Sequence, residues 1–342
     1  MRVALASPPW ERVPPTAYGG IEVVVSLLAE GLVHRGHDVT LYASGDSVTS
    51  GRLQAVCPKP LRVTNVENPL PYQLVHLAAV LAEADQFDII HNHCGEMLMA
   101  FSGLTSTPML TTIHGPMTSD TQIVWDHYTG YYNAISESAR NGFPDFRYLG
   151  VVYNGIDVAS FPFSDQKDDY LLFLGRISAE KGTHFAIDVA QATGRRLIIA
   201  GKIDRVDREY YEQQIAPRID GSQIVLWGEA DADAKRQLFA RALCLLHPIT
   251  WPEPFGLVMA EAMACGTPVI AFRRGSVPEV IQDGQTGVIV DSLDEMIAAV
   301  GLVDQIDPSR CRRHVESQFS ADQMVAGYEH LYQTVRGATS FP

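Results

Sequence analysis

The chain has 342 residues, of which 46% are hydrophobic and 19% are charged, and its formal net charge at pH 7 is −14. This length is typical of about two domains, each with a sizeable core. The negative charge argues against a broad basic face of the kind that binds nucleic acid or anionic membranes. We therefore expect no nucleic-acid partner, and an anionic ligand would have to be held by a few local cations and backbone N–H groups.

The five cysteines are scattered along the chain and form no C-x-x-C pair. Their scatter favours reduced thiols over disulfides or a zinc site. The N-terminal stretch "MRVALASPPW" is typical of a strand that ends in a proline loop, and no run approaches the roughly 18 apolar residues that span a bilayer. The sequence thus predicts a cytoplasmic chain without a transmembrane segment, and it carries no signal for an oligomeric state.

Short β-rich runs alternate with helical patterns in the first part of the chain. The runs lie at 2–7, 38–43, 88–93, 109–114, 131–138 and 150–154, and helices are expected near 20–35 and 70–85. This alternation is typical of βαβ units on a parallel sheet. It predicts a Rossmann-like N-terminal domain over residues 1–155.

The alternation restarts after the polar stretch 154–169, which has the composition of a linker. Strands are expected at 170–176, 196–201, 224–229, 244–248, 268–272 and 287–291, and helices from 182 and at 206–218, 233–241 and around Glu261. We predict a second Rossmann-like domain over 156–319, with the two parallel sheets facing across a cleft. A last helix within 320–342 is expected to pack back on the first domain.

Ligands of open parallel sheets bind beyond the carboxyl ends of the strands, so the residues there deserve most weight. Gly19 and Gly20 precede an apolar helix, and adjacent glycines let backbone N–H groups approach a phosphate closely. Arg176 closes a strand and Lys181 follows five residues later, a pairing that suits a diphosphate. The alternatives are a glycine pair that only starts a helix and two cations in solvent.

Two acids stand in "WPEPFGLVMAEAMACGTPVI", residues 251–270. Prolines on both sides of Glu253 hold it in a rigid, extended loop. A helix is predicted to begin near 255–257, with unpaired N–H groups at its start and Glu261 about 6 Å further along its axis. The two acids can therefore contact different parts of one elongated ligand. The alternative for Glu261 is a core acid that caps backbone or pairs with an arginine.

These motifs resemble those of the retaining nucleotide-sugar glycosyltransferases of family GT4. The resemblance is carried by "EPFGLVMAEAMACGTPVIA" (253–271), "GSVPEVI" (275–281), "DGQTGVIV" (283–290), "GRISAEKG" (175–182) and "YNGID" (153–157). It covers nearly the whole chain. It implies an α/β chain with the GT-B fold, in which the second domain holds the donor and the first holds most of the acceptor.

The resemblance also implies roles for residues of the donor site. Arg176 and Lys181 fall where the family binds the donor diphosphate. Gly19 and Gly20 fall where its N-terminal glycine loop meets the phosphate or the sugar. Glu253 falls where the family's first Glu meets the hydroxyls of the donor sugar.

The remaining positions follow in the same way. Glu261 falls on the ribose-binding Glu, and His114 matches the first-domain histidine beside the reacting sugar, although a satisfied loop histidine is the alternative. Further donor contacts are expected from three consecutive residues, Phe255, Gly256 and Leu257.

The sequence therefore predicts a retaining glycosyltransferase that moves a hexose from a nucleotide-diphosphate sugar, UDP-glucose or a close relative, to a hydroxyl of a small-molecule or glycan acceptor. The expected catalytic residues are His114, Glu253, Arg176 and Lys181, and no cofactor or essential metal is expected. The alternatives are a GT-B-fold sugar-nucleotide epimerase or phosphorylase, or a non-catalytic protein that binds nucleotide sugars.

The acceptor site is predicted from aromatic and histidine residues of the first domain, and the candidates are Trp10, Tyr18 and His93. A further aromatic cluster forms either a wall for the acceptor or ordinary packing; its members are Trp125, Tyr128, Tyr131 and Tyr132.

Two metal-like patterns are discounted. Asp231 and Asp233 form a D-x-D at a predicted helix start, where acids act as caps. His91, His93 and Cys94 are expected to line a site rather than to hold a metal, since no further ligand lies close in sequence.

Overall fold

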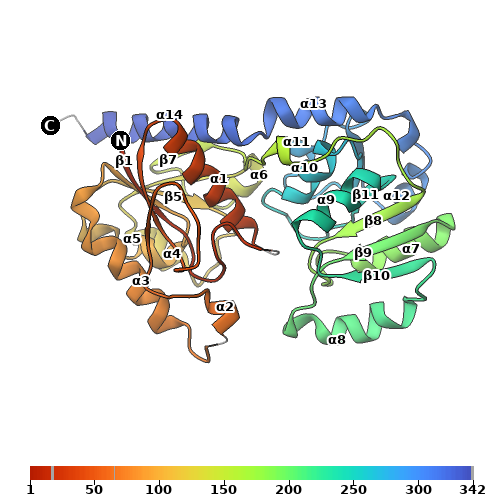
Figure 1. The fold of residues 1–342 in the computed structure, drawn as a ribbon, viewed down its shortest axis with the longest axis horizontal. Coiled ribbons are helices and arrows are strands. Elements are labelled where there is room, and N and C mark those ends of the chain that lie inside the picture. The colour runs from red at the N-terminus through yellow and green to blue at the C-terminus, as the bar shows by residue number, and fades with distance from the viewer. Residues whose placement is uncertain (17–18, 65, 340–342) are drawn as a thin grey trace. The chain divides into compact units, whose positions relative to one another are not determined.

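The computed structural model describes residues 1–16, 19–64 and 66–339, and the chain divides into two compact units (Figure 1). Unit 1 contains Met1–Gly155 together with the chain from Ala321 onward, and unit 2 contains Ile156–Ser320. Each unit is built on one sheet in which all paired strands are parallel. The predicted fold class, α/β with two parallel sheets, is confirmed.

Unit 1 has a seven-stranded sheet with the order β3-β2-β1-β4-β5-β6-β7. Its strands are β1 (Arg2–Ala6), β2 (Asp38–Tyr42), β3 (Arg52–Gln54), β4 (Ile89–Asn92), β5 (Met109–Ile113), β6 (Tyr131–Ala134) and β7 (Tyr148–Val151). Its helices are α1 (Gly20–His34), α2 (Leu61–Thr64), α3 (Leu70–Ala82), α4 (Glu96–Met99), α5 (Gln122–His127), α6 (Glu137–Arg140) and α14 (Ala321–Thr339). The chain order changes direction between β1 and β4, which places the loops after these two strands at the switch point of the sheet.

The central strands of unit 1 are covered on both faces. Every residue of β4 and β5 is buried, as expected for parallel strands between layers of helices. On one face α14 packs against α1, where Gly31 leaves room for the side chain of Val325. Tyr332 of α14 is fully buried, and its hydroxyl lies 2.6 Å from Nδ1 of His91 on β4. The helix is thus tied to the sheet by both apolar packing and a buried polar contact.

Unit 2 has a six-stranded sheet with the order β10-β9-β8-β11-β12-β13. Its strands are β8 (Tyr170–Leu174), β9 (Arg196–Ala200), β10 (Ile224–Gly228), β11 (Cys244–His247), β12 (Val269–Phe272) and β13 (Gly287–Val290). Its helices are α7 (Thr183–Thr193), α8 (Arg208–Tyr210), α9 (Ala232–Arg241), α10 (Leu257–Ala264), α11 (Val277–Val280), α12 (Leu293–Ala299) and α13 (Pro308–Gln318). The switch point lies between β8 and β11, so the loops after these strands define the ligand edge.

Two predicted elements are less regular than expected. The helix predicted over 206–218 is a chain of short turns of different pitch, including a π-turn over Tyr211–Ile215. Pro217 lies in the last turn, Ala216–Arg218, where it cannot supply the N–H that a regular helix needs. The strand predicted over 131–138 stops at Ala134, because the hydroxyl of Ser136 accepts a hydrogen bond from the N–H of Ala139 and starts α6.

The aromatic cluster of unit 1 is packing. The side chains of Trp125 and Tyr132 are fully buried and that of Tyr128 is 4% exposed. The rings of Trp125 and Tyr132 meet edge to face with centroids 5.1 Å apart. These three residues belong to the hydrophobic core of unit 1, which favours packing over an aromatic wall that faces an acceptor.

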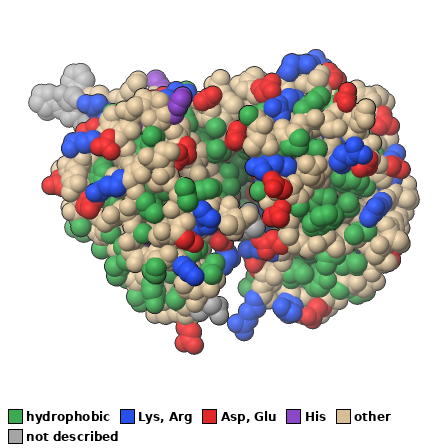
Figure 2. Space-filling model, in the orientation of Figure 1, with side chains coloured by type: hydrophobic (Ala, Val, Ile, Leu, Met, Phe, Trp, Pro, Cys, Tyr) green, Lys and Arg blue, Asp and Glu red, His purple; other side chains and the backbone are tan. Residues whose placement is uncertain are grey.

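Charged side chains are mixed over the face drawn in Figure 2, where Lys and Arg lie among Asp and Glu. Within the ranges given above, no helix combines the length and the apolar character that crossing a bilayer requires.

Candidate active site

The ligand edge of unit 2 carries two cations in the loop between β8 and α7. Arg176 is the second residue after β8, and its guanidinium donates to a carboxylate oxygen of Asp207 at 2.9 Å and to Glu180. Lys181 lies two residues before the start of α7 and donates to Glu253. The ammonium of Lys181 also lies 5.4 Å from the ring centroid of Trp251, close enough for a cation–π contact. Both cations are thus held in place at the edge of the sheet.

Lys181 and Glu253 come from different loops and form one ion pair. Their side chains are 21% and 14% exposed, so the pair is only partly open to solvent. Glu253 lies in the loop after β11, six residues beyond its last residue, His247. The structure therefore brings together two of the predicted catalytic residues, separated by 72 positions in the chain.

The Glu253 loop is braced by the loop after β12. The backbone N–H of Ser276 donates to the carbonyl oxygen of Glu253 at 3.0 Å, and its hydroxyl donates to the carbonyl oxygen of Phe255 at 2.8 Å. Gly275 has φ +53°, and a Cβ there would lie 2.4 Å from the backbone N of Glu253. Only glycine allows this close approach without displacement of the loop.

Helix α10 begins just after this loop. Gly256 precedes it with a left-handed φ of 74°, and no side chain caps the helix start. Glu261 lies one turn inside, with its side chain 6% exposed, and accepts a hydrogen bond from Nζ of Lys235 at 2.6 Å. Glu261 is thus a paired, nearly buried carboxylate, as one of the sequence alternatives suggested, although its partner is a lysine of α9 rather than an arginine.

Lys235 and His247 were not identified from the sequence. The contact of Lys235 with Glu261 joins two helices, so only the packing of α9 against α10 reveals it. His247 ends β11, and its Nε2 is buried with no hydrogen-bond partner in the part of the chain that the structure describes. Burial, with a smaller effect of the Lys181 charge, lowers the pKa of His247 to about 3 and keeps it neutral. A histidine at the end of a central strand was the available signal.

The two acids of the D-x-D pattern lie at the start of α9. A carboxylate oxygen of Asp231 accepts a hydrogen bond from the N–H of Ala234 at 2.8 Å, which makes Asp231 the N-cap. Asp233 pairs with Arg236 on the helix surface. Across the described residues no cluster of three or more His, Cys, Asp or Glu side chains is arranged for a metal ion.

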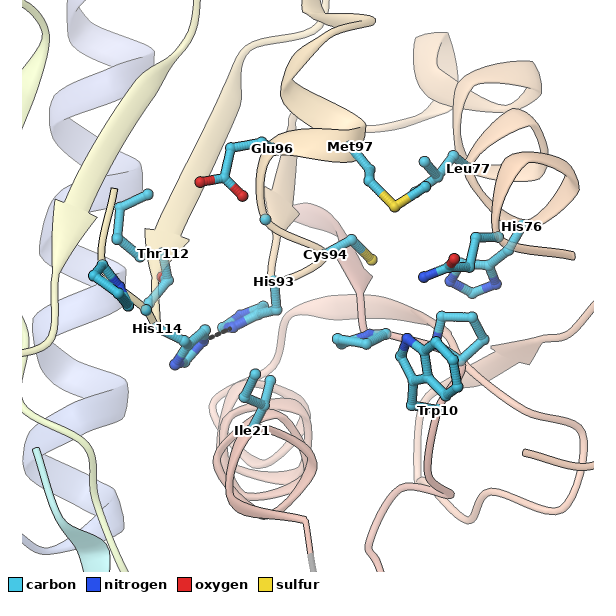
Figure 3. Close-up of a pocket in the computed structure, with 17 residues that line it drawn as sticks. Trp10, Ile21, His76, Leu77, His93, Cys94, Glu96, Met97, Thr112 and His114 are labelled. Carbon is cyan, nitrogen blue, oxygen red and sulfur yellow. Dashed lines mark hydrogen bonds between the residues drawn. The ribbon is translucent and has the colours of Figure 1, made fainter. Parts of the chain in front are cut away.

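In unit 1, two predicted histidines form a pair at the ends of neighbouring strands. Nδ1 of His93 lies 2.9 Å from Nε2 of His114 (Figure 3). Burial lowers the pKa of His114 to about 4, and burial with the nearby His91 and His114 lowers that of His93. Both rings are therefore neutral near pH 7. Nε2 of His93 is buried and has no partner among the described residues.

The histidine pair lines a cavity of about 350 Å³ that also includes Trp10. Two of the three predicted acceptor residues, Trp10 and His93, thus line the same cavity. The third, Tyr18, lies outside the described residues. The cavity lies within unit 1, and the cation loop with its two acids lies within unit 2.

Gly19 and Gly20 stand at the start of α1. Gly19 has φ +149°, and a Cβ there would lie 2.8 Å from Cβ of Pro15 and 3.0 Å from a carboxylate oxygen of Glu22. A glycine is therefore required for steric reasons at this turn. Burial raises the pKa of Glu22 to about 7, and the Glu11 carboxylate adds to the rise, against the opposing effects of a backbone N–H and Arg62.

The raised pKa of Glu22 predicts a pH-dependent stability. Folded Glu22 keeps its proton up to about pH 7, whereas the unfolded chain releases it near pH 4.5. The free energy of unfolding therefore falls as the pH rises from 4.5 to about 7 and stays low at higher pH. Glu22→Gln does not titrate, so we expect it to gain about 2 to 4 kcal/mol over the wild type by pH 8 and nothing at pH 4. Urea unfolding across this range, with Glu67→Gln as the exposed control, measures the difference; equal curves for wild type and Glu22→Gln would refute it.

The fold and the matches to known proteins define the class. Two α/β units with parallel sheets are the architecture of GT-B glycosyltransferases. Residues 18–160 match the family described as Glycosyltransferase Family 4, and residues 159–308 match Glycosyl transferases group 1. The chain belongs to the glycosyltransferases of family GT4, and the predicted resemblance is confirmed.

Several proteins are similar over the full length. The chain is 26% identical to a glycogen synthase of Mycobacterium tuberculosis, covering 99% of this chain and 94% of that protein. It is 28% identical to a phosphatidyl-myo-inositol mannosyltransferase of Mycolicibacterium smegmatis, covering 99% and 95%. The structure of Anabaena HepE in complex with UDP-glucose covers 98% of this chain and 100% of that one, with TM-score 0.74 and 18% identity, and shows the shared fold.

Proposed function

We propose that this glycosyltransferase moves a hexose from a nucleotide-diphosphate sugar, UDP-glucose or a close relative, to an acceptor hydroxyl with retention of the anomeric configuration. The observation that carries the proposal is the convergence of Arg176, Lys181 and Glu253 at the ligand edge of unit 2, beside the uncapped start of α10. Cations and the backbone N–H groups of a helix start suit a diphosphate, and a carboxylate suits sugar hydroxyls. The UDP-glucose complex of HepE supports the choice of donor.

The proposed reaction breaks the bond between the anomeric carbon and the diphosphate oxygen. Negative charge then gathers on the leaving diphosphate, and Arg176 and Lys181 stabilise it. The acceptor oxygen bonds to the anomeric carbon on the same face, and its proton passes to the departing diphosphate. No protein nucleophile and no metal is needed in this scheme, because the two cations supply the positive charge.

Glu253 and His114 orient the sugar in this scheme. The carboxylate of Glu253 accepts hydrogen bonds from sugar hydroxyls, which requires it to loosen from Lys181 as the diphosphate takes that cation. His114, neutral because of its burial, offers a hydrogen bond to the reacting sugar without adding charge beside a cationic transition state. The carboxylate of Glu261 is proposed to accept hydrogen bonds from the two hydroxyls of the ribose.

Donor binding tests the proposal. We expect the melting temperature to rise with one nucleotide sugar among the UDP, GDP and ADP conjugates of glucose and mannose, in EDTA. Glu261→Ala removes the proposed ribose contact and should weaken binding of that nucleotide sugar about ten- to a hundredfold, since a charge-assisted hydrogen bond contributes about 1.5 to 3 kcal/mol. Scanning fluorimetry over a range of ligand concentrations measures both, and Glu316→Ala, at an exposed side chain of α13, is the control. No shift with any nucleotide, or a shift with NAD(H) alone, contradicts the proposal.

Product analysis separates the alternatives. An epimerase or a phosphorylase of the same fold would change the donor sugar without an organic acceptor, in water or in phosphate. A non-catalytic binding protein would bind the donor and turn over none of a broad acceptor panel. Mass spectrometry of reactions with and without acceptors distinguishes these outcomes from transfer.

A further inference from the structure

The cavity of unit 1 has a distribution of polar groups that specifies a kind of ligand. At one end lie Thr112, His93, His114 and Glu96, and at the other lie Trp10, Leu77 and Met97, with His76 beside them (Figure 3). The two ends therefore differ: one offers hydrogen bonds and the other offers mainly apolar surface.

The hydrogen-bonding end holds a group that the protein itself leaves without a partner. Nε2 of His93, in a side chain 2% exposed, is buried and unpaired within the described ranges. A buried ring nitrogen without a partner is costly unless a ligand supplies one. Glu96 at the start of α4 adds a carboxylate that accepts hydrogen bonds from hydroxyls. Thr112 is already engaged, since its hydroxyl donates to Asn133 at 2.9 Å.

The apolar end is fixed by backbone contacts. The carbonyl oxygens of Pro9 and Trp10 accept hydrogen bonds from the N–H groups of Leu61 and Arg62 at 2.9 and 3.2 Å, which hold the Trp10 loop against α2. His76 is tied in the same way, with Nε2 2.9 Å from the carbonyl oxygen of Ser7. A pre-formed wall of this kind favours a ligand with a rigid apolar body.

The cavity contains no positive charge among the described residues that line it. No Lys or Arg lines it, and burial lowers the pKa of His76, His93 and His114, which are neutral near pH 7. Glu96 is the only charged side chain in this described lining. A phosphate or carboxylate group would lose its hydration here without gaining a cation and would face a like charge.

We infer that this cavity takes the acceptor, and that the acceptor is an alcohol with an apolar body and no anionic group, rather than a phosphorylated polyol or a phospholipid headgroup. The inference rests on the proposed function, in which His114 lies beside the reacting sugar. The apolar body packs against Trp10 and Met97, and the reacting hydroxyl lies at the end with the His93 and His114 pair.

Matched probes test the charge preference without a donor. We choose 2,6-dihydroxynaphthalene, its anionic analogue 6-hydroxy-2-naphthoate, and glucose as a hydroxyl-rich probe without an apolar body. Calorimetry with the full chain should give the uncharged naphthalene a dissociation constant about tenfold or more below those of the other two. Tighter binding of the anionic analogue or of glucose overturns the inference.

Two substitutions place the probe in the cavity. Trp10→Ala should weaken the binding of 2,6-dihydroxynaphthalene about tenfold, because aromatic contact area is lost. Trp10→Phe should recover most of the affinity. Met97→Arg adds the missing cation and should shift the preference toward 6-hydroxy-2-naphthoate. The matched controls are Trp227→Ala in β10 and Ile123→Arg in α5, two exposed side chains whose replacement should change neither dissociation constant. Equal effects of the variants and their controls refute the inference.

The outcome for the cavity is separable from the outcome for the enzyme. Donor binding is read from the thermal shift with nucleotide sugars, and transfer is read from the mass of a glycosylated naphthalene. A donor shift without binding of the uncharged probe contradicts the acceptor class alone. Probe binding without any nucleotide shift contradicts the proposed transfer and leaves the charge preference of the cavity supported.

Discussion

Lys181→Met is expected to lower kcat/KM for sugar transfer by about a hundred- to a thousandfold, the effect typical of removing one preorganised group that stabilises a leaving anion. Lys181 lies at the ligand edge against the face of Trp251, a contact that can persist when the diphosphate takes the place of Glu253. Initial rates at varied donor concentration measure the loss. Lys59→Met, which removes an exposed lysine of unit 1, is the matched control and should retain the wild-type rate.

A purely structural role for Lys181 makes a different prediction. If Lys181 only neutralised Glu253, then Lys181→Met combined with Glu253→Gln would recover the rate, because no uncompensated carboxylate would remain. We expect no recovery, since the double variant lacks both the cation and the carboxylate that the proposed reaction uses. Recovery to within tenfold of the wild type would show that the pair is structural.

Gly275→Ala is expected to lower the free energy of unfolding by about 3 kcal/mol. The alanine would adopt a left-handed φ, which costs about 1 to 2 kcal/mol, and its Cβ would press on the backbone of Glu253, where overpacking costs about 1 to 3 kcal/mol more. Chemical unfolding measures the change. Displacement of the Glu253 loop should also reduce the thermal shift with the nucleotide sugar.

Gly284→Ala separates backbone strain from the clash. Gly284 has a similar φ of +68°, but nothing lies within 4 Å of a Cβ placed on it. This variant should therefore lose only about 1 to 2 kcal/mol and keep full donor binding. Equal losses for the two variants would show that the contact between Gly275 and Glu253 is not tight in solution.

The positions of Arg176, Lys181 and Glu253 could be predicted from the sequence because they depend on local patterns. A buried β-rich run followed by a turn puts a residue at the carboxyl end of a strand, and β8 and β11 are neighbours because parallel α/β sheets reverse their order near the middle. The alternation of runs likewise predicted both sheets. The short edge strand β3 carries no comparable apolar run and was missed.

The partners of these residues could not be predicted, because they depend on packing between elements. Lys235 meets Glu261 only where α9 and α10 lie side by side, and the burial that keeps His247 neutral comes from the folded loops around it. The aromatic residues Trp125 and Tyr132 illustrate the same limit. Their spacing permits either a wall or a core, and only the fold places them inside.

The ion pairs at the ligand edge of unit 2 have a consequence for competing anions. Arg176 is paired with Asp207 and Glu180, and Lys181 is paired with Glu253, so carboxylates of the protein itself neutralise both cations. Inorganic phosphate or a bare nucleoside diphosphate must separate Lys181 from Glu253 and leave that carboxylate without a partner. A sugar nucleotide brings hydroxyls that replace the lost contact. Under the proposed function, the site therefore favours a ligand that carries both a diphosphate and a sugar over simple anions.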